Sequence, residues 1–456
     1  MTARAHAANP PRRWASVALV LATLCIGALT LTPGGRDDPA AAGASWWATV
    51  SCLTCSRAWL ADMISNVALF VPLGAVLVAV SAAVRRAVLI GAAASLLIEL
   101  LQLSGLAAGR TPAIADLVSN TLGTWAGSLL AVYAPSWVSP SVPLARALRN
   151  GWAVICAATW ISLAWALQPA TPVQPRGAVS LSAVPFTPGY GWFAAEAMRT
   201  DVNDVMIAHH GTGPVLVATR RSDSSTARVT VRGRDTRSGI VPVVFVHEPA
   251  MTGVDPLTTR PHLLLGQHDQ DASLASDLRA AHWGLQLPDL RAPGAFALGR
   301  DSVVLEAAVT TRWWRLVWST PPEPMPRHEA TLRLSPAIGW ALVQSIVPMR
   351  AVVGELLTAV WLFVWFAPLG YWSASTSHAR SAARTPRVMQ CLVAVAWAGG
   401  LLAVGWVAAE VTGTSPVSLA QGAWCALSAV VGAGLRSLVG LVPLRHRDSL
   451  ERGRSD

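Results

Sequence analysis

The sequence predicts a multispan α-helical membrane protein of about eight transmembrane helices, with an extracytoplasmic all-β sandwich inserted between spans five and six. Of the 456 residues, 53% are hydrophobic and only 13% are charged, and the mean hydropathy is +0.44. Apolar runs of about 20 residues, long enough to cross a bilayer, recur towards both ends of the chain. Between them, residues 169–345 are more polar and contain short β-prone segments separated by turn residues.

The net charge is a signal of topology. The formal charge of +10 could indicate a nucleic-acid-binding protein, but every basic residue is Arg and the Arg clusters flank apolar runs. Basic residues beside spans mark the cytoplasmic side of a membrane. We therefore expect a membrane partner and no nucleic acid.

The first apolar run, Ala15–Leu31, follows a basic segment, residues 1–13, that we expect to be a cytoplasmic tail. Such a run could be a cleavable signal peptide or a first span. No small-residue cleavage site follows it, and it is long enough to cross the bilayer. We therefore prefer an uncleaved first span.

The loop after this span carries Cys52 and Cys55 in a C-x-x-C arrangement. With the N-terminus inside, the loop lies outside, where such a pair could close a small disulfide or supply half of a metal site. No second Cys pair follows nearby, so the two residues are a disulfide candidate and no metal is expected.

Four further spans precede the β-prone region: Ile64–Val84, Ala87–Ala107, Ile114–Tyr133 and Trp152–Leu167. The basic residues Arg85 and Arg86, then Arg146 and Arg149, place the turns before the third and fifth spans in the cytoplasm. The 108–113 loop, with Arg110, is then outside.

Polar residues in the second to fourth spans are the candidate site. Glu99 and Gln102 share one helix face, as do Asp116 and Asn120, because residues three or four apart lie on the same side. The predicted topology brings these four, with Asn66 and Arg110, to the outer half of the membrane. Glu99 is expected about 12 Å from the outer end of its helix.

We further expect Arg110 to approach Glu99, with Asp116 as a rival partner. A carboxylate cannot stay ionised among apolar helices without a partner or water, and the Arg fork suits a carboxylate or a ligand phosphate.

The ordered motifs of residues 62–130 resemble the VanZ-like family. They are N-x-x-x-F-x-P-L-G, E-x-x-Q, a loop Arg, and D-x-x-x-N-x-x-G-x-x-x-G, at Asn66, Phe70, Pro72, Leu73, Gly74, Glu99, Gln102, Arg110, Asp116, Asn120, Gly123 and Gly127. The resemblance implies a bacterial envelope protein related to a determinant of resistance to the glycopeptide teicoplanin, with no settled biochemical activity. It assigns residues 14–168 to a VanZ-like domain, in which Pro72, Gly74, Gly123 and Gly127 shape the helix contacts.

Residues 169–345 read as an all-β sandwich, and one segment, 262–279, weakly resembles concanavalin-like or laminin-G sandwiches. The insert contains several histidines and one neighbouring acid that could be imagined as a metal cluster: His209, His210, His247, Glu248, His262 and His268. None has a helical ligand spacing, so surface or strand-end positions are favoured. Trp192, Trp283, Trp313 and Trp314 could stack on a sugar or form the sandwich core.

Residues 351–442 form a second transmembrane region with the expected spans Ala351–Trp372, Val388–Ala409 and Val417–Val442, followed by a cytoplasmic tail, 443–456. The P-L-G at residues 368–370 repeats the earlier motif. Glu410 and the stretch 414–424 fall roughly where later motifs would, while Leu362 or Trp361 stands in the place of Asn66. These residues form either a degenerate repeat or a chance match.

Three functions follow as hypotheses for this plasma (inner) membrane protein with both termini in the cytoplasm. The first is binding of an amphiphilic or lipid-linked envelope ligand in an outward-facing polar cavity, with the β domain contacting glycan or headgroups and a contribution to glycopeptide tolerance. The alternative is a hydrolase or transferase acting on an envelope lipid or cell-wall precursor. Transport is less well supported, because no acidic residue continues the path inwards. The polar residues could also serve only as contacts between helices. No cofactor is expected.

Overall fold

The structure is a computed structural model. It describes residues 12–31, 58–80, 83–104, 112–170, 176–181, 193, 196–203, 205–207, 212–216, 225–235, 240–247, 261–297, 301–320, 328–344, 351–377 and 387–441.

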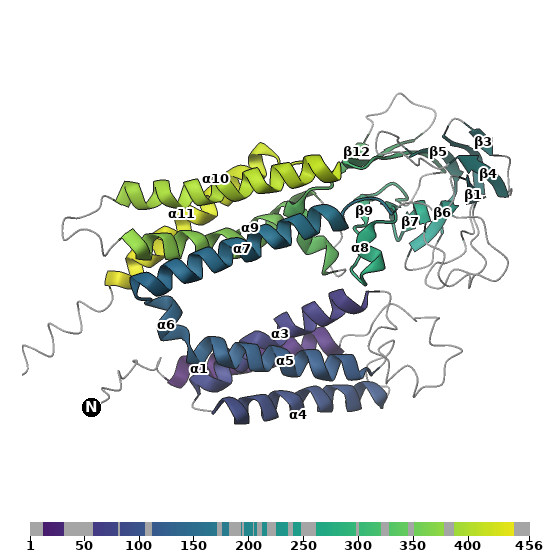
Figure 1. The fold of residues 1–456 in the computed structure, drawn as a ribbon. Coiled ribbons are helices and arrows are strands. Elements are labelled where there is room, and N and C mark those ends of the chain that lie inside the picture. The colour runs from purple at the N-terminus through teal and green to yellow at the C-terminus, as the bar shows by residue number, and fades with distance from the viewer. Residues whose placement is uncertain are drawn as a thin grey trace, which may run out of the picture. The chain divides into compact units, whose positions relative to one another are not determined.

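Nine helices of the described residues belong to the apolar parts of the chain (Figure 1). They are α1 (Arg12–Leu31), α3 (Trp59–Ala79), α4 (Val84–Leu103), α5 (Ile114–Val132), the short α6 (Ala134–Val138), α7 (Val142–Ala166), α9 (Ala351–Ser377), α10 (Arg387–Thr412) and α11 (Leu419–Leu441). Six of them, α1, α3, α4, α9, α10 and α11, are long and apolar enough to cross a membrane. The protein is therefore a multi-pass membrane protein, with its β region between the third and fourth of these six helices.

Several helix boundaries differ from those expected. The second span was expected to begin at Ile64, but α3 begins five residues earlier, at Trp59. α4 ends at Leu103, four residues before the expected end at Ala107. α7 begins ten residues before Trp152. The apolar runs locate these helices but do not set their ends, because helical hydrogen bonding can begin before an apolar run, as in α3 and α7, or stop before it, as in α4.

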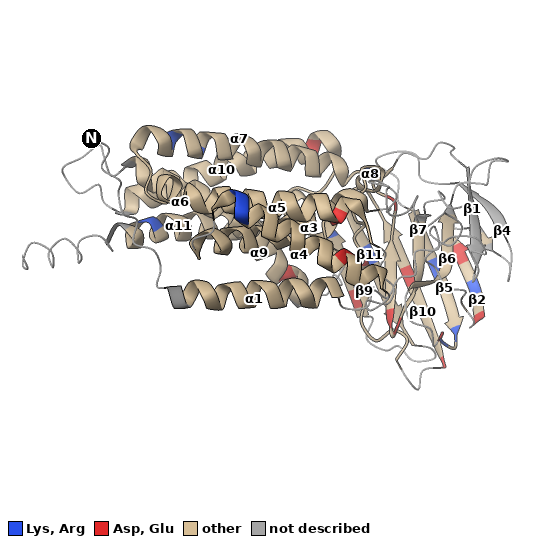
Figure 2. Ribbon diagram, turned by 90° about the horizontal axis from the view of Figure 1, so that it is seen from below, with Lys and Arg blue, Asp and Glu red and all other residues tan. Residues whose placement is uncertain are grey.

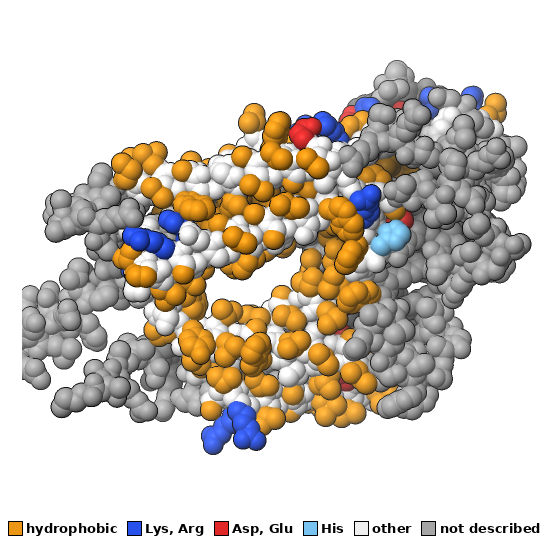
Figure 3. Space-filling view, in the orientation of Figure 1, with side chains coloured by type: hydrophobic (Ala, Val, Ile, Leu, Met, Phe, Trp, Pro, Cys, Tyr) orange, Lys and Arg blue, Asp and Glu red, His pale blue; other side chains and the backbone are white. Residues whose placement is uncertain are grey.

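The helices and strands divide into two compact units. The first contains α1, α3, α4 and α5 together with the strands, and the second contains α6, α7, α9, α10 and α11. α7, the expected fifth span, packs against α10 in the second unit. Hydrophobic side chains cover the helices on the face shown in Figure 3, and charged residues are sparse along them (Figure 2).

Glycines bring α3 and α5 of the first unit into backbone contact. A Cβ added to Gly127 would lie 2.7 Å from the carbonyl carbon of Val71, and one added to Gly74 would lie 2.8 Å from that of Thr124. Gly123 faces the backbone of α3 in the same way. Small residues allow such close approach between membrane helices, and these three glycines lie where the backbones of α3 and α5 meet.

The second unit repeats this close contact between α9 and α11. A Cβ on Gly370 would lie 2.7 Å from the carbonyl carbon of Ala429, and one on Gly432 would lie 2.8 Å from that of Ala367. Phe366, four residues before Gly370, is fully buried, as is Phe70, four residues before Gly74.

The insert forms two six-stranded antiparallel sheets. The first has the order β4 (Thr212–Leu216), β1 (Arg176–Leu181), β6 (Ile240–His247), β7 (Pro261–His268), β8 (Asp271–Ala275) and β9 (Leu290–Ala292). The second has the order β12 (His328–Arg333), β11 (Trp313–Ser319), β10 (Ser302–Val309), β5 (Ser225–Arg232), β2 (Glu196–Val202) and β3 (Val205–Ile207). β9 lies against β11 and β12, and β3 lies against β4. Two layers in contact fit the predicted sandwich.

Alternating burial builds the interior of the insert. In β10, every second residue is buried, and in β5 Val229 and Val231 are fully buried. Trp314 is also fully buried, which favours a core role over sugar stacking, whereas Trp283 and Trp313 are exposed. Among the described residues of this region, the other helical elements are the four-residue helix α8 (Arg279–His282) and the 3-10 helix Pro336–Leu342.

Candidate functional site

The predicted polar residues meet where α3, α4 and α5 come together in the first unit. Asn66 of α3 donates a hydrogen bond from Nδ2 to Oδ1 of Asp116, at the start of α5, over 2.8 Å. Glu99 of α4 accepts a hydrogen bond at Oε2 from the backbone N–H of Ala113, also over 2.8 Å. The three helices are thus joined by polar contacts near the start of α5.

The carboxylate of Glu99 lies next to the N-terminal end of α5. Its exposed fraction is 8%, and its donor, Ala113, directly precedes α5. The N-terminus of a helix presents free N–H groups and a partial positive charge. Glu99 lies four residues before the end of α4, so it is about 6 Å from that end and not 12 Å as expected.

A second layer of polar contacts joins α4 to α5 and to α1. Asn120 donates from Nδ2 to Oγ of Ser95 over 2.9 Å, and both side chains are buried. Gln102 donates from Nε2 to the carbonyl oxygen of Thr30 in α1 over 3.2 Å. The contact with Thr30 brings α1 to the edge of the site.

Two amide oxygens in this layer lack a donor. Oε1 of Gln102 and Oδ1 of Asn120 are both buried and accept no hydrogen bond from the residues that the structure describes. Because each amide has an acceptor and a donor end, turning either amide over would leave a donor unpaired instead. Buried polar atoms without partners are uncommon and costly.

The depth of the site follows from where each helix begins. Asn66 is seven residues from the start of α3, about 10 Å along its axis, whereas Asp116 is two residues from the start of α5. Asn66 lies deeper in its helix than the expected start at Ile64 implied, because α3 begins at Trp59. Since the two side chains are bonded, α3 extends beyond α5 at this end by between one and two turns.

Some site residues were missed from the sequence. Ser95 precedes Glu99 by four residues and Gln102 by seven, so all three lie on one face of α4. That spacing could have identified Ser95, but a serine in an apolar helix was too common a feature to single out. Thr30 contributes only a backbone oxygen, which no side-chain pattern indicates.

Other predicted residues lie outside the part of the chain that the structure describes. These are Arg110, with its expected approach to Glu99, and the disulfide candidates Cys52 and Cys55. Among the described residues, no group of three His, Cys, Asp or Glu side chains is arranged to hold a metal ion.

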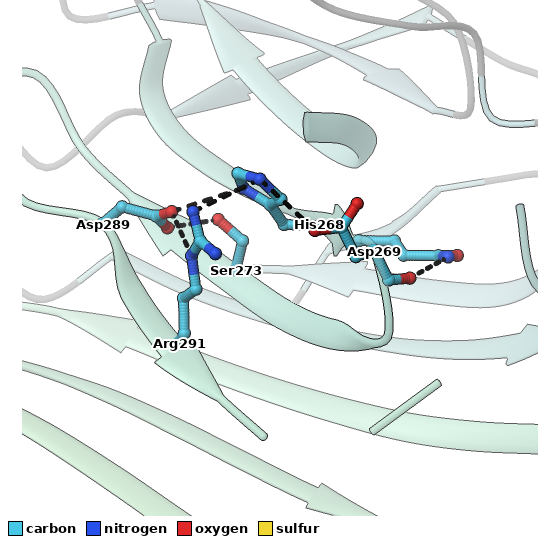
Figure 4. A network of polar contacts seen from close by, with 6 residues as sticks. His268, Asp269, Ser273, Asp289 and Arg291 are labelled. Carbon is cyan, nitrogen blue, oxygen red and sulfur yellow. Dashed lines mark hydrogen bonds and ion pairs between the residues drawn. The ribbon is translucent and has the colours of Figure 1, made fainter. Parts of the chain in front are cut away.

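The sandwich contains one further polar network, centred on Asp289 (Figure 4). Its Oδ2 lies 2.8 Å from Nε of Arg291 and 3.5 Å from Nδ1 of His268, and Ser273 donates to its other oxygen. Burial alone would raise the pKa of Asp289, but hydrogen bonds with His268, Ser273 and Arg291 and the charge of Arg291 lower it below its ordinary value. Ser273 is bonded to the carboxylate rather than to the imidazole, so the network is not a Ser-His-Asp nucleophile arrangement.

His268 is thus part of a sandwich network. His209, His210 and Glu248 lie outside the described residues, as do the side chains of His247 and His262.

The apolar helices, the glycine contacts and the polar cluster define a multi-pass membrane protein with an all-β insert. Residues 20–135 match the model of the VanZ/LLP1 family, and this stretch includes α3, α4, α5 and every predicted site residue. Residues 20–135 are therefore a VanZ-like region of this membrane protein. Neither the curated proteins nor the solved structures gave a match.

Proposed function

We propose that the polar cluster of α3, α4 and α5 binds an amphiphilic or lipid-linked ligand of the bacterial envelope. The observation that carries this proposal is the pair of buried amide oxygens, on Gln102 and Asn120, that no described residue satisfies. They lie on the same two helix faces as Glu99 and Asp116. Hydroxyl or amide donors of a headgroup would satisfy them, while the apolar surface of the helices would contact an acyl or isoprenoid chain.

The assigned ligand-binding residues are Asn66, Glu99, Gln102, Arg110, Asp116 and Asn120. Arg110, in the loop between α4 and α5, would supply a positive charge for a phosphate or for one of the two carboxylates. Together these groups would recognise a headgroup that offers both hydrogen-bond donors and an anion. A cell-wall precursor linked to a lipid phosphate has that chemistry.

The proposal includes eight spans, with both termini in the cytoplasm and the sandwich outside the plasma membrane. The two further spans are α5 and α7, of 19 and 25 residues, both long enough to cross. Polar site residues lower the hydropathy of α5, and Arg146 and Arg149 lower that of α7. Arg85 and Arg86, exposed in the first turn of α4, support a cytoplasmic start for that helix.

An internal duplication supports the same count. The α3–α5 and α9–α11 contacts have the same register, because Gly74 and Gly127 of one pair correspond to Gly370 and Gly432 of the other. Five buried positions of α4 also recur at the same spacing in α10: 91, 95, 98, 99 and 102 correspond to 401, 405, 408, 409 and 412. In this scheme α7 corresponds to α1, and the sandwich occupies the loop after it.

The duplication also isolates the site, because the second copy has lost both carboxylates and both asparagines. Leu362, Ala409 and Cys425 stand in place of Asn66, Glu99 and Asn120, so the acid and both asparagines are lost. Thr412 and Gln421 stand in place of Gln102 and Asp116, so these two positions stay polar but the carboxylate is lost. In this register Ala409, not Glu410, occupies the position of Glu99. A polar set that only joined helices would be equally useful in both copies.

The experiment is a binding and turnover assay on purified protein with radiolabelled lipid-linked cell-wall precursor, comparing wild type with Asn120→Ala and the matched control Cys425→Ala. Both variants truncate a buried side chain at corresponding positions. We expect Asn120→Ala to weaken retention of the precursor at least tenfold and Cys425→Ala to leave it within about twofold. Equal retention by all three proteins would refute the proposal. Product formed by wild type but not by Glu99→Gln would favour the hydrolase or transferase alternative.

A further inference from the structure

The outer end of α3 is attached to the sandwich by its first turn. The carbonyl oxygen of Gly284 accepts hydrogen bonds from the backbone N–H groups of Leu60 and Ala61, over 2.9 and 3.0 Å. The first N–H groups of a helix have no partner within it, and a carbonyl oxygen there also faces the positive end of the helix dipole. The turn that follows α8 therefore acts as the cap of α3, and Figure 1 shows α8 beside this end of the helix.

Gly284 is required at this position for two reasons. Its φ of +67° lies in the left-handed region, which disfavours side chains. A Cβ there would also lie 2.8 Å from Cε2 of the Trp59 indole and closer still to Nε1. The first residue of α3 thus packs directly against the backbone of the sandwich.

A second attachment lies one turn deeper, next to the site. Ser65 donates from Oγ to the carbonyl oxygen of Val343 over 3.0 Å. The N–H of Gln286 in turn donates to the carbonyl oxygen of Leu342 over 2.8 Å, so the segments around 284 and 342 are joined to each other. Ser65 directly precedes Asn66, the residue that binds Asp116.

We propose that these contacts, defined as the α3 clasp (Gly284, Val343, Trp59, Leu60, Ala61 and Ser65), make the sandwich a positioning element for the intramembrane site. α3 extends beyond α5 by between one and two turns, and the contacts of this end with the sandwich hold it there. Glycan or headgroup contacts that move the sandwich would move Asn66 relative to Asp116. This coupling rests on the proposed function only in treating the cluster as a ligand site.

The experiment measures hydrogen exchange of the amides of residues 59–70 in full-length protein in lipid nanodiscs without added ligand. Gly284→Ala is compared with Gly294→Ala, a glycine with φ of +70° and nothing within 4 Å of an added Cβ. Both variants strain a left-handed glycine in the sandwich, but only the first pushes on Trp59. Ser65→Ala is a milder third variant, which removes one hydrogen bond without backbone strain.

We expect exchange in 59–70 to rise about tenfold or more in Gly284→Ala, to rise measurably in Ser65→Ala, and to stay within about twofold in Gly294→Ala. Adding Trp59→Ala to Gly284→Ala should bring exchange back towards that of Trp59→Ala alone, because the colliding indole is gone. Equal exchange in the two glycine variants, or no change in Ser65→Ala, would overturn the clasp. Because the experiment uses no ligand, a failure of the clasp would leave the binding proposal standing. If the clasp were confirmed but the binding assay found no ligand, only the binding proposal would fail.

Discussion

Replacing Gly127 by Ala should separate α3 from α5 and so weaken the hydrogen bond between Asn66 and Asp116 in the polar site. The added Cβ would lie 2.7 Å from the carbonyl carbon of Val71, whereas ordinary contact begins near 3.4 Å. The helices must therefore part by at least about 0.7 Å, and by more if the carbonyl oxygen is also to be cleared. Backbone atoms cannot rotate away as a flexible side chain would.

The size of the effect follows from that displacement. Overpacking of a close interface costs about 1–3 kcal/mol, and we expect the upper part of that range because both partners are backbone. The Asn66–Asp116 hydrogen bond, 2.8 Å long, would stretch to about 3.5 Å or beyond if the whole pair moved apart, where it contributes little.

The assay is thermal unfolding of the purified protein in one detergent, with Gly399→Ala as the matched control. Gly399 also lies within an apolar helix, but nothing lies within 4 Å of an added Cβ. Ala should there be neutral or stabilising by up to about 1 kcal/mol. If Gly127→Ala were as stable as Gly399→Ala, the close contact of α3 and α5 would be refuted.

Three further predictions concern the sandwich, the helix contact and the topology. The lowered pKa of Asp289 means that its charged form stabilises the fold at neutral pH, and this contribution is lost as the pH falls through and below the ordinary value near 4. Asp289→Asn should therefore be less stable than wild type at pH 7, and its unfolding free energy should change less between about pH 5 and 3. A pH dependence like that of wild type would contradict this. Ser128→Ala removes a buried hydroxyl that lies 3.3 Å from the carbonyl oxygen of Gly74, and urea unfolding should show a loss of about 1 kcal/mol or less; a loss of several kcal/mol would contradict it. The third prediction uses single cysteines in a cysteine-free background and a thiol reagent that does not cross the membrane. A cysteine replacing the exposed Asp269 should react in intact cells, and one replacing the exposed Arg86 should react only after lysis. The opposite pattern would reverse the proposed orientation.

Periodicity and hydropathy were enough to locate the long helices and most strands. The segment 302–309 was recognised as a strand with its observed bounds, because its alternating pattern matches a sheet with one buried face. β1, β9 and β12 are short or lack clear alternation, so pairing with β6, β8 and β11 stabilises them rather than a pattern of their own. The ends of α3 and α4 were misplaced because hydropathy does not follow helical hydrogen bonding: both helices begin before their apolar runs and stop before those runs end.

The candidate site was predictable in its helix faces but not in its contacts. The spacing of Glu99 and Gln102 and of Asp116 and Asn120 determined which side chains share a face. Which residues pair across helices depends on how far each helix extends, and α3 extends further than its hydropathy indicated. Asn66 therefore binds Asp116, and Glu99 binds a backbone N–H, contacts that no single-helix pattern specifies.

The most direct test of the proposed site is to give α3, α4 and α5 the residues that stand at the matching positions of α9, α10 and α11. The variant Asn66→Leu, Glu99→Ala, Asp116→Gln, Asn120→Cys carries the side chains that the corresponding positions of the second unit already hold, three of which are buried there. Native mass spectrometry of protein purified from its membrane in mild detergent measures the lipids that remain bound. We predict a bound amphiphile on the wild-type protein that is absent from a variant with unchanged helix content. The same bound species at the same occupancy on both proteins would contradict the account.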